Sequence, residues 1–177
     1  KPSFGMISRD GVLRTSQTFD QVGVFANALE DAALVTDVLA DFDPLDEGCF
    51  WRPRPKLCAG LASPRSQDPH FAWFDMPYFD RLAPDAHAGL RDIVARLGDR
   101  VQQVSAPISF VELIEAHAVI QTYEIPRNLD RIRQEFGDIF PPELGKLMAH
   151  STTISDKAYE DAMQCRMGAI DYFASFF

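Results

Sequence analysis

The residue pattern between positions 70 and 105 predicts a strand, a helix and a second strand in close succession, and this order limits the possible folds more than any other feature. Residues 70–75 form an almost wholly apolar run, which is typical of a strand buried on both faces. Pro84 favours a helix start and Gly98 favours its end. Apolar side chains recur between them at helical spacing, namely Ala86, Leu90, Ile93, Val94 and Leu97. Residues 100–105 then alternate Val with polar side chains, so this βαβ unit predicts two parallel strands.

The segment before this unit predicts one helix and a long irregular connection. Residues 1–24 mix β-branched and polar side chains with glycine, which indicates short strands and turns. Asn27 and Glu30 have capping-box spacing, so we expect a helix to begin there and to end before Pro44. Residues 46–69 are rich in proline and predict an irregular crossing. A linker between two domains is the alternative interpretation.

The last part of the chain, residues 106–177, is predicted to be mainly helical. Ser109 and Glu112 form a second capping box and open a helix that we expect to end just before Pro126. Further helices are expected over 127–136, over 142–150, and after a cap at Ser155. The predicted class is α/β, with part of a mixed, largely parallel sheet flanked by helices and a helix-rich C-terminal half.

Charge and cysteine content exclude several classes of protein. The net charge is −9, which argues against the basic footprint of nucleic-acid binding. No apolar run is long enough for a transmembrane helix, and no secretory signal is visible at Lys1. Cys49, Cys58 and Cys165 are odd in number and widely spaced, which indicates free thiols in a reducing compartment and a cytoplasmic location.

No nucleophile elbow, zinc motif, Walker loop or dinucleotide fingerprint is present in the sequence. His117, Gln121 and Glu124 lie on one face of a predicted helix with the spacing of a metal pair, but no further ligand is signalled and a half-buried or solvated face is favoured. Arg166 next to Cys165 favours a reactive thiol, yet without a general base a packed thiol is the better interpretation.

Three further groups admit a functional and a plain interpretation, and the plain one is favoured in each case. The acidic cluster of Asp43, Asp46 and Glu47 is interpreted as a solvated turn. Trp51, Arg52 and Arg54 could stack on an aromatic ligand but are interpreted as surface loop packing. Phe74 to Phe79, with Tyr78 among them, could line an acyl pocket but are interpreted as core packing. From the residues alone, no active site is visible.

Four short motifs follow one another within the first 33 residues. They read K-P-S-F-G at 1–5, S-R-D-G-V at 8–12, D-Q-V-G at 20–23 and E-D-A-A at 30–33. Their order and spacing resemble the amidase signature family, in which the segment reads roughly K-P-T-x-G, S-R-x-G-V, S-x-D-x-x-G-P-M-A-R and E-D-A-A. The G-P-M-A-R stretch departs from the pattern, because Gly23 is followed by V-F-A-N and the Pro and Arg are lost.

The resemblance implies a Ser–cis-Ser–Lys triad that forms an acyl-enzyme, with backbone N–H groups holding the oxyanion. In the family all three residues precede the K-P-T segment, so Lys1 and Ser3 match non-catalytic positions. No catalytic residue and no substrate-binding residue is therefore assigned in this chain. Asp20 is the polar side chain most suspected of bonding the signature loop, although a carboxylate that satisfies its own turn is the favoured interpretation.

The resemblance also implies an incomplete single domain over 1–177, and the aromatic ending at Phe177 agrees with that. Its parts are a core segment beside the absent signature (1–45), the Pro-rich crossing (46–69), the βαβ unit (70–105) and the helical portion (106–177). The chain alone is expected to be inactive.

The implied activity is that of a small-molecule amidase without metal or organic cofactor, with an amide as substrate, no nucleic-acid or membrane partner, and a homodimer as a compatible assembly. The amidase subunit of a glutamine-dependent amidotransferase is the alternative within the family. A non-catalytic α/β interaction module is the alternative outside it.

Overall fold

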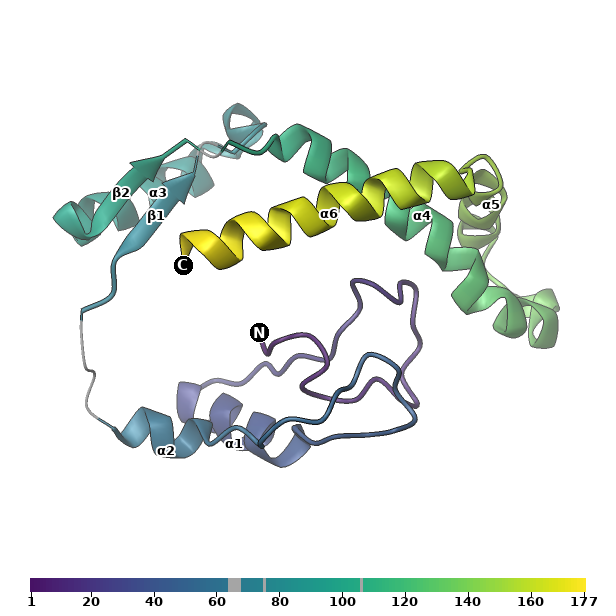
Figure 1. Ribbon diagram of the computed structural model, residues 1–177, viewed down its shortest axis with the longest axis horizontal. Helices are drawn as coiled ribbons and strands as arrows, with labels where there is room; N and C mark the ends of the chain where they lie inside the picture. Colours follow the sequence, from purple (N-terminus) through teal and green to yellow (C-terminus); the bar gives the residue numbers. More distant parts are fainter. Residues whose placement is uncertain (64–67, 75, 106) are drawn as a thin grey trace. The chain divides into compact units, whose positions relative to one another are not determined.

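The computed structural model describes residues 1–63, 68–74, 76–105 and 107–177 (Figure 1). The chain divides into two compact units. The first comprises Lys1–Pro64 with Ala118–Tyr159, and the second comprises Arg65–His117 with Glu160–Phe177. Helices α4 (Phe110–Glu135) and α6 (Asp156–Phe176) each contribute residues to both units. None of the helices within the described ranges is long and apolar enough to cross a membrane.

The second unit contains the predicted βαβ element. Strands β1 (Phe71–Phe74) and β2 (Val101–Val104) pair in parallel, with Phe71 opposite Val101, and α3 (Pro84–Leu97) connects them. The parallel pairing confirms the α/β class. Gly98 ends α3 with a φ of 55°, as its position predicted. Short 3₁₀ turns η1 (Phe79–Arg81) and η2 (Gly98–Arg100) flank the helix.

The expected burial of the first strand on both faces is wrong for this structure. Phe71 is 40% exposed and the other residues of β1 are half-buried. The reason is that β1 pairs with one neighbour only among the described residues, so part of its surface has no protein against it. Asp75, at the end of the predicted strand, lies outside the described residues, as do 64–67 of the Pro-rich crossing.

The first unit is built on loops and short helices rather than on strands. The predicted strands in residues 1–24 are wrong, since the segment forms turns and one isolated antiparallel bridge between Ile7 and Ala40. Helix α1 (Leu29–Leu39) starts later than expected, after an extended Ala28 that gives no side-chain cap, so Asn27 lies outside the helix. It also ends four residues early, because Ala40 turns extended and makes the bridge.

The Pro-rich crossing contains a short helix that the sequence pattern did not predict. Helix α2 (Leu57–Ala62) has no side-chain cap of its own. The carboxylate of Asp37 in α1 serves instead, accepting the backbone N–H groups of Leu57 at 2.8 Å and Cys58 at 3.0 Å. A side chain distant in sequence therefore stabilises the start of α2.

The predicted helix end before Pro126 is wrong, because α4 continues through it to Glu135 and absorbs the helix expected over 127–136. Proline in a helix interior removes one backbone hydrogen bond. Packing on both sides compensates for that loss, since Ile125 and Leu129 are buried in a cluster with Met148. The side chains packed against this cluster are Ile132, Phe140 and Leu144.

The remaining helical predictions are confirmed. The Ser109 hydroxyl accepts the N–H of Glu112 at 3.2 Å at the start of α4, and the Ser155 hydroxyl accepts the N–H of Ala158 at 3.2 Å at the start of α6. Helix α5 (Pro142–Ser151) covers the range expected over 142–150, and the turn η3 (Gly137–Ile139) precedes it.

Candidate functional site

The motif segment 1–24 is held in place by a buried ion pair between Arg9 and Asp46. The two guanidinium contacts measure 2.7 Å (Nη2 to Oδ1) and 3.0 Å (Nε to Oδ2), and both side chains are almost fully buried. The backbone N–H groups of Arg9 and Gly48 also donate to the Asp46 carboxylate. The hydrogen bond from Arg9 is the main reason that the pKa of Asp46 lies well below its usual range.

The expectation of a solvated acidic turn is therefore wrong for one of its three members. Asp46 is buried because it is the counter-ion of Arg9. Asp43 is half-buried and accepts the Ser8 hydroxyl at 2.6 Å, while Glu47 is exposed as expected. The cluster links two stretches of the first unit that lie more than 30 residues apart in the sequence.

Two glycines allow the same stretches to approach closely. A Cβ on Gly5, whose φ is +68°, would lie 2.0 Å from the carbonyl oxygen of Gly48. A Cβ on Gly48 would lie 2.2 Å from Nη2 of Arg9. The Cys49 thiol, also buried, donates to the Gly5 carbonyl at 3.3 Å. The chain crossing therefore requires glycine at position 5, and a side chain at position 48 would displace the Arg9 guanidinium from the ion pair.

Asp20 supports the turn interpretation within this chain. Its Oδ2 atom accepts the backbone N–H groups of Thr15 at 2.5 Å and Ser16 at 3.0 Å, and the Thr15 hydroxyl donates to the same oxygen at 3.1 Å. Arg9 donates to the backbone oxygens of Gln17 and Asp20. Residues 15–20 therefore form a closed loop that Asp20 stabilises from within.

Glu124, the third residue of the candidate metal face, is buried and belongs to the same loop site. It accepts the hydroxyls of Ser16 at 2.5 Å, Thr18 at 2.5 Å and Tyr159 at 2.9 Å, with the Thr18 N–H at 3.0 Å. His117 is exposed, and the described residues contain no group of three His, Cys, Asp or Glu side chains that would hold a metal. The plain interpretation of this helix face holds for His117, whereas Glu124 has a role that the sequence did not reveal.

Burial by itself raises the pKa of Glu124, but the hydrogen bonds from Ser16, Thr18 and Tyr159 outweigh it and the pKa is lowered. Burial and the same contact with Glu124 raise the pKa of Tyr159. The carboxylate is therefore ionised at neutral pH while its hydroxyl donors stay protonated.

Two of the three residues that formed the possible stacking surface make contacts with neighbouring parts of the first unit. Arg52 lies over the Phe50 ring at 3.7 Å and donates to the Phe4 carbonyl, and Arg54 pairs with Asp41. Trp51 is 78% exposed. The contacts of Arg52 and Arg54 agree with the expected loop packing, whereas the exposure of Trp51 does not.

Cys165 is a free thiol, half-buried on α6. The Arg166 guanidinium beside it in the sequence contacts the sulfur of Met167 at 3.9 Å. This contact supplies no general base for the thiol, and the partial burial of Cys165 agrees with the interpretation as a packed thiol.

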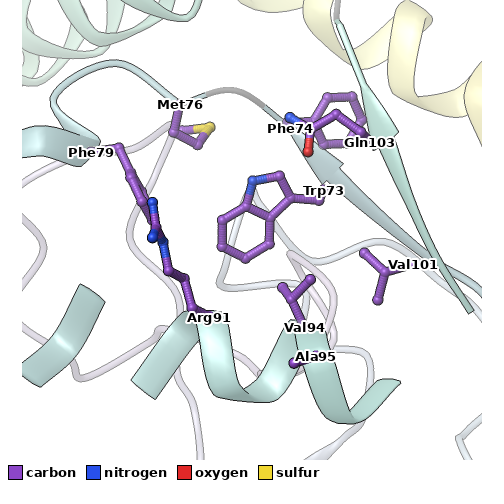
Figure 2. A pocket seen from close by; sticks show the side chains of 9 residues that line it. All are labelled: Trp73, Phe74, Met76, Phe79, Arg91, Val94, Ala95, Val101 and Gln103. Atoms are coloured by element: carbon purple, nitrogen blue, oxygen red, sulfur yellow. The ribbon is translucent and has the colours of Figure 1, made fainter. Parts of the chain in front are cut away.

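Three residues of the segment 74–79, namely Phe74, Met76 and Phe79, line a cavity of about 470 Å³ in the second unit (Figure 2). Trp73 points into it and meets Phe79 edge to face at 5.7 Å, and Arg91 of α3 also lines it. Phe74 itself packs against rings of α4 and α6, at 5.9 Å from Phe110 and 5.7 Å from Phe173. The core interpretation therefore fits Phe74, which also lines the cavity.

The family model for amidases matches residues 1–175. The chain belongs to the amidase family. A glutamyl-tRNA(Gln) amidotransferase subunit of Marinobacter nauticus is 35% identical over 137 residues, which are 74% of this chain and 27% of that protein. The corresponding subunit of Gloeobacter violaceus is 28% identical over 156 residues, 82% of this chain and 32% of that protein. The chain thus spans about a third or less of these relatives.

Solved structures show the same fold. A chain of an inhibitor-bound vestigial protein complex, described as revealing the origins of an s-triazine catabolic enzyme, matches with a TM-score of 0.82 at 22% identity, over 100% of this chain and 38% of that chain. The peptide amidase of Stenotrophomonas maltophilia matches with a TM-score of 0.59 at 20% identity, over 89% of this chain and 37% of that chain. At these identities the likeness concerns the fold.

The residues that build the site were only partly signalled by the sequence. Arg9 and Asp20 stand inside the matched motifs, so their positions were visible. Asp46 and Glu124 were visible only as members of groups with another interpretation. A buried carboxylate needs hydrogen-bonding partners. For Asp46 and Glu124 these partners are distant in the sequence, so no local pattern identifies the two residues.

Proposed function

We propose that the full-length protein containing this chain hydrolyses a carboxamide and that its substrate is glutamine, as in the amidase subunit of a glutamine-dependent amidotransferase. The observation that carries this proposal is the family match over residues 1–175, together with the 35% identity to a glutamyl-tRNA(Gln) amidotransferase subunit. The order of the two enzyme hypotheses is therefore reversed, since the sequence alone placed the small-molecule amidase first.

The chemistry implied by the family is nucleophilic. A serine upstream of Lys1 attacks the amide carbon, ammonia leaves with a proton delivered by the Lys and cis-Ser relay, and water hydrolyses the acyl-enzyme to the acid. The role proposed for this chain is to shape the wall next to those serines. The Arg9–Asp46 pair and the 15–20 loop are suited to that role because they hold the motif segment rigidly from several sides.

A small-molecule amidase that works without a partner is the second candidate. The loss of the Pro and Arg after Gly23 favours it, because the chain departs there from the family pattern. Phe25, in the altered stretch, is fully exposed in this chain, so the change lies on a surface available to the rest of the protein.

Ammonia release by the full-length protein tests the proposal. Glutamine and a panel of simple aliphatic and aromatic amides are compared, with and without a serine-reactive fluorophosphonate. We expect glutamine turnover that the reagent abolishes and a partner subunit that co-purifies. Turnover of simple amides by the isolated protein, with none of glutamine, would favour the second candidate. No turnover of any amide with any co-purified partner would favour a non-catalytic module.

A further inference from the structure

Glu124 is a buried charge, and within the described part of the chain the hydrogen bonds found for its carboxylate come from neutral donors. Its side-chain partners are the hydroxyls of Ser16, Thr18 and Tyr159, and the residue is 5% exposed. None of the ion pairs found in the described ranges involves it. Burying a carboxylate without a cation is costly, and apolar packing would join a helix to a loop more cheaply. What the polar contact adds is direction, because hydrogen bonds fix the donors in position and orientation.

The donors that Glu124 orients lie on one short loop. Both carboxylate oxygens contact it, Oε2 through Ser16 and the Thr18 N–H, and Oε1 through the Thr18 hydroxyl. One helical turn on, the Asn128 amide donates to the Thr15 carbonyl at 3.2 Å. Helix α4 therefore presents two polar side chains to the same loop.

The loop is also held from two other directions. Asp20 accepts the N–H groups of Thr15 and Ser16 from within the loop, and Arg9 donates to the Gln17 and Asp20 carbonyls from the ion pair with Asp46. A loop of six residues with this many fixed hydrogen bonds has little freedom left. Residues 20–23 leave the loop directly and carry the D-Q-V-G motif.

We propose that Glu124 is a positioning residue for amide hydrolysis, acting through Ser16 and Thr18 to hold the segment 15–23 against the catalytic loop of the full-length protein. This inference rests on the proposed function, since it assumes that the motif segment lies beside the catalytic serines. Displacing a substrate-contacting wall by as little as an ångström lowers turnover about a hundredfold without removing any reacting group.

The test uses the full-length protein with Glu124→Gln, which keeps the side-chain volume and removes the charge. Glu115→Gln is the matched control, because Glu115 is an exposed carboxylate on the same helix. Active sites are counted by titration with the fluorophosphonate, and kcat is expressed per titrated site. We expect E124Q to lower kcat per site by about tenfold to a hundredfold with KM within about twofold, and E115Q to match the wild type.

A merely structural role predicts a different result, namely fewer titratable sites and a lower Tm with an unchanged kcat per site, and that result would overturn the proposal. If E124Q does not fold, Ser16→Ala removes a single donor and the same two readouts decide. If the wild type turns over no amide, the proposed function fails and the catalytic part of the inference fails with it, and hydrogen exchange of the peptide covering 15–20 then decides only whether Glu124 holds this loop. Faster exchange in E124Q than in E115Q supports it, and equal exchange overturns it.

Discussion

Gly5 lies so close to Gly48 that a Cβ added to Gly5 would stand 2.0 Å from the Gly48 carbonyl oxygen. The crossing that these two residues form connects the motif segment to the stretch that carries Asp46. Its consequences can be measured, because the chain contains a second glycine with nearly the same backbone angle. Gly11 has a φ of +73° against +68° for Gly5, and a Cβ on Gly11 would meet no atom within 4 Å.

Gly5→Ala is therefore expected to destabilise the full-length protein more than Gly11→Ala. The strain of a left-handed residue costs about 1–2 kcal/mol in both variants, and the clash adds about 1–3 kcal/mol in G5A alone. Urea unfolding of both variants measures the difference. Equal losses in the two variants would show that the crossing tolerates a side chain and that the close approach is unimportant.

Asp46→Asn is expected to lower the free energy of unfolding by about 3–5 kcal/mol, because it leaves the Arg9 guanidinium buried without its counter-ion. Asp41→Asn is the matched control, since Asp41 pairs with Arg54 at the surface and more than half of each side chain is exposed. The control should leave the unfolding midpoint unchanged. A small effect of D46N, equal to that of D41N, would contradict the structural role of the pair.

Acid is expected to destabilise the protein through Asp46 and Glu124. The folded state lowers the pKa of both carboxyls, so the unfolded state binds more protons in acid. Their contribution to stability is complete above the pKa values of the unfolded state, which are about 4. It is lost as the pH falls toward the lower pKa values of the folded state. Urea midpoints between pH 7 and pH 3 measure this loss. The urea midpoint should depend less steeply on pH in E124Q than in E115Q. Equal pH dependence in the two variants would show that Glu124 does not contribute to the acid destabilisation.

Asp37→Ala is expected to loosen the start of α2 while α1 stays intact. The Asp37 carboxylate caps that helix from outside, and Lys56 at its N-cap position supplies no side-chain bond. Hydrogen exchange of the peptide covering 55–62 should become faster in D37A. Asp31→Ala removes an exposed carboxylate from the same helix, α1, and should leave the exchange unchanged. An effect of the same size in both variants would assign it to α1 rather than to the cap.

The sequence predicted the elements whose signals are local. Helix α3 with Gly98, the parallel pair β1 and β2, and the caps Ser109 and Ser155 each follow from residues within a few positions of one another. Residues 1–24 were less predictable, because their backbone groups are bonded largely by side chains and not by a strand partner. Pro126 misled the prediction of α4, since a helix-breaking signal was outweighed by buried neighbours.

The contacts of the candidate site could be predicted from the sequence less well than the fold. Ser16 and Glu124 lie 108 positions apart in the chain, and Arg9 and Asp46 lie 37 apart. No periodicity connects residues so far apart in the sequence. The sequence therefore groups Glu124 with His117 and Gln121, and it predicts a solvated Asp46. The motifs indicated the family of the segment, and the structure shows which side chains hold it.

We propose that this chain is the scaffold beside an amidase active site and that the nucleophilic serine lies outside residues 1–177. The most direct measurement labels the full-length protein with a fluorophosphonate and locates the adduct by peptide mass spectrometry. We expect a single modified serine on a peptide that precedes Lys1, and no adduct on Ser3, Ser8 or Ser16. A stoichiometric adduct on any serine within residues 1–177 would contradict it.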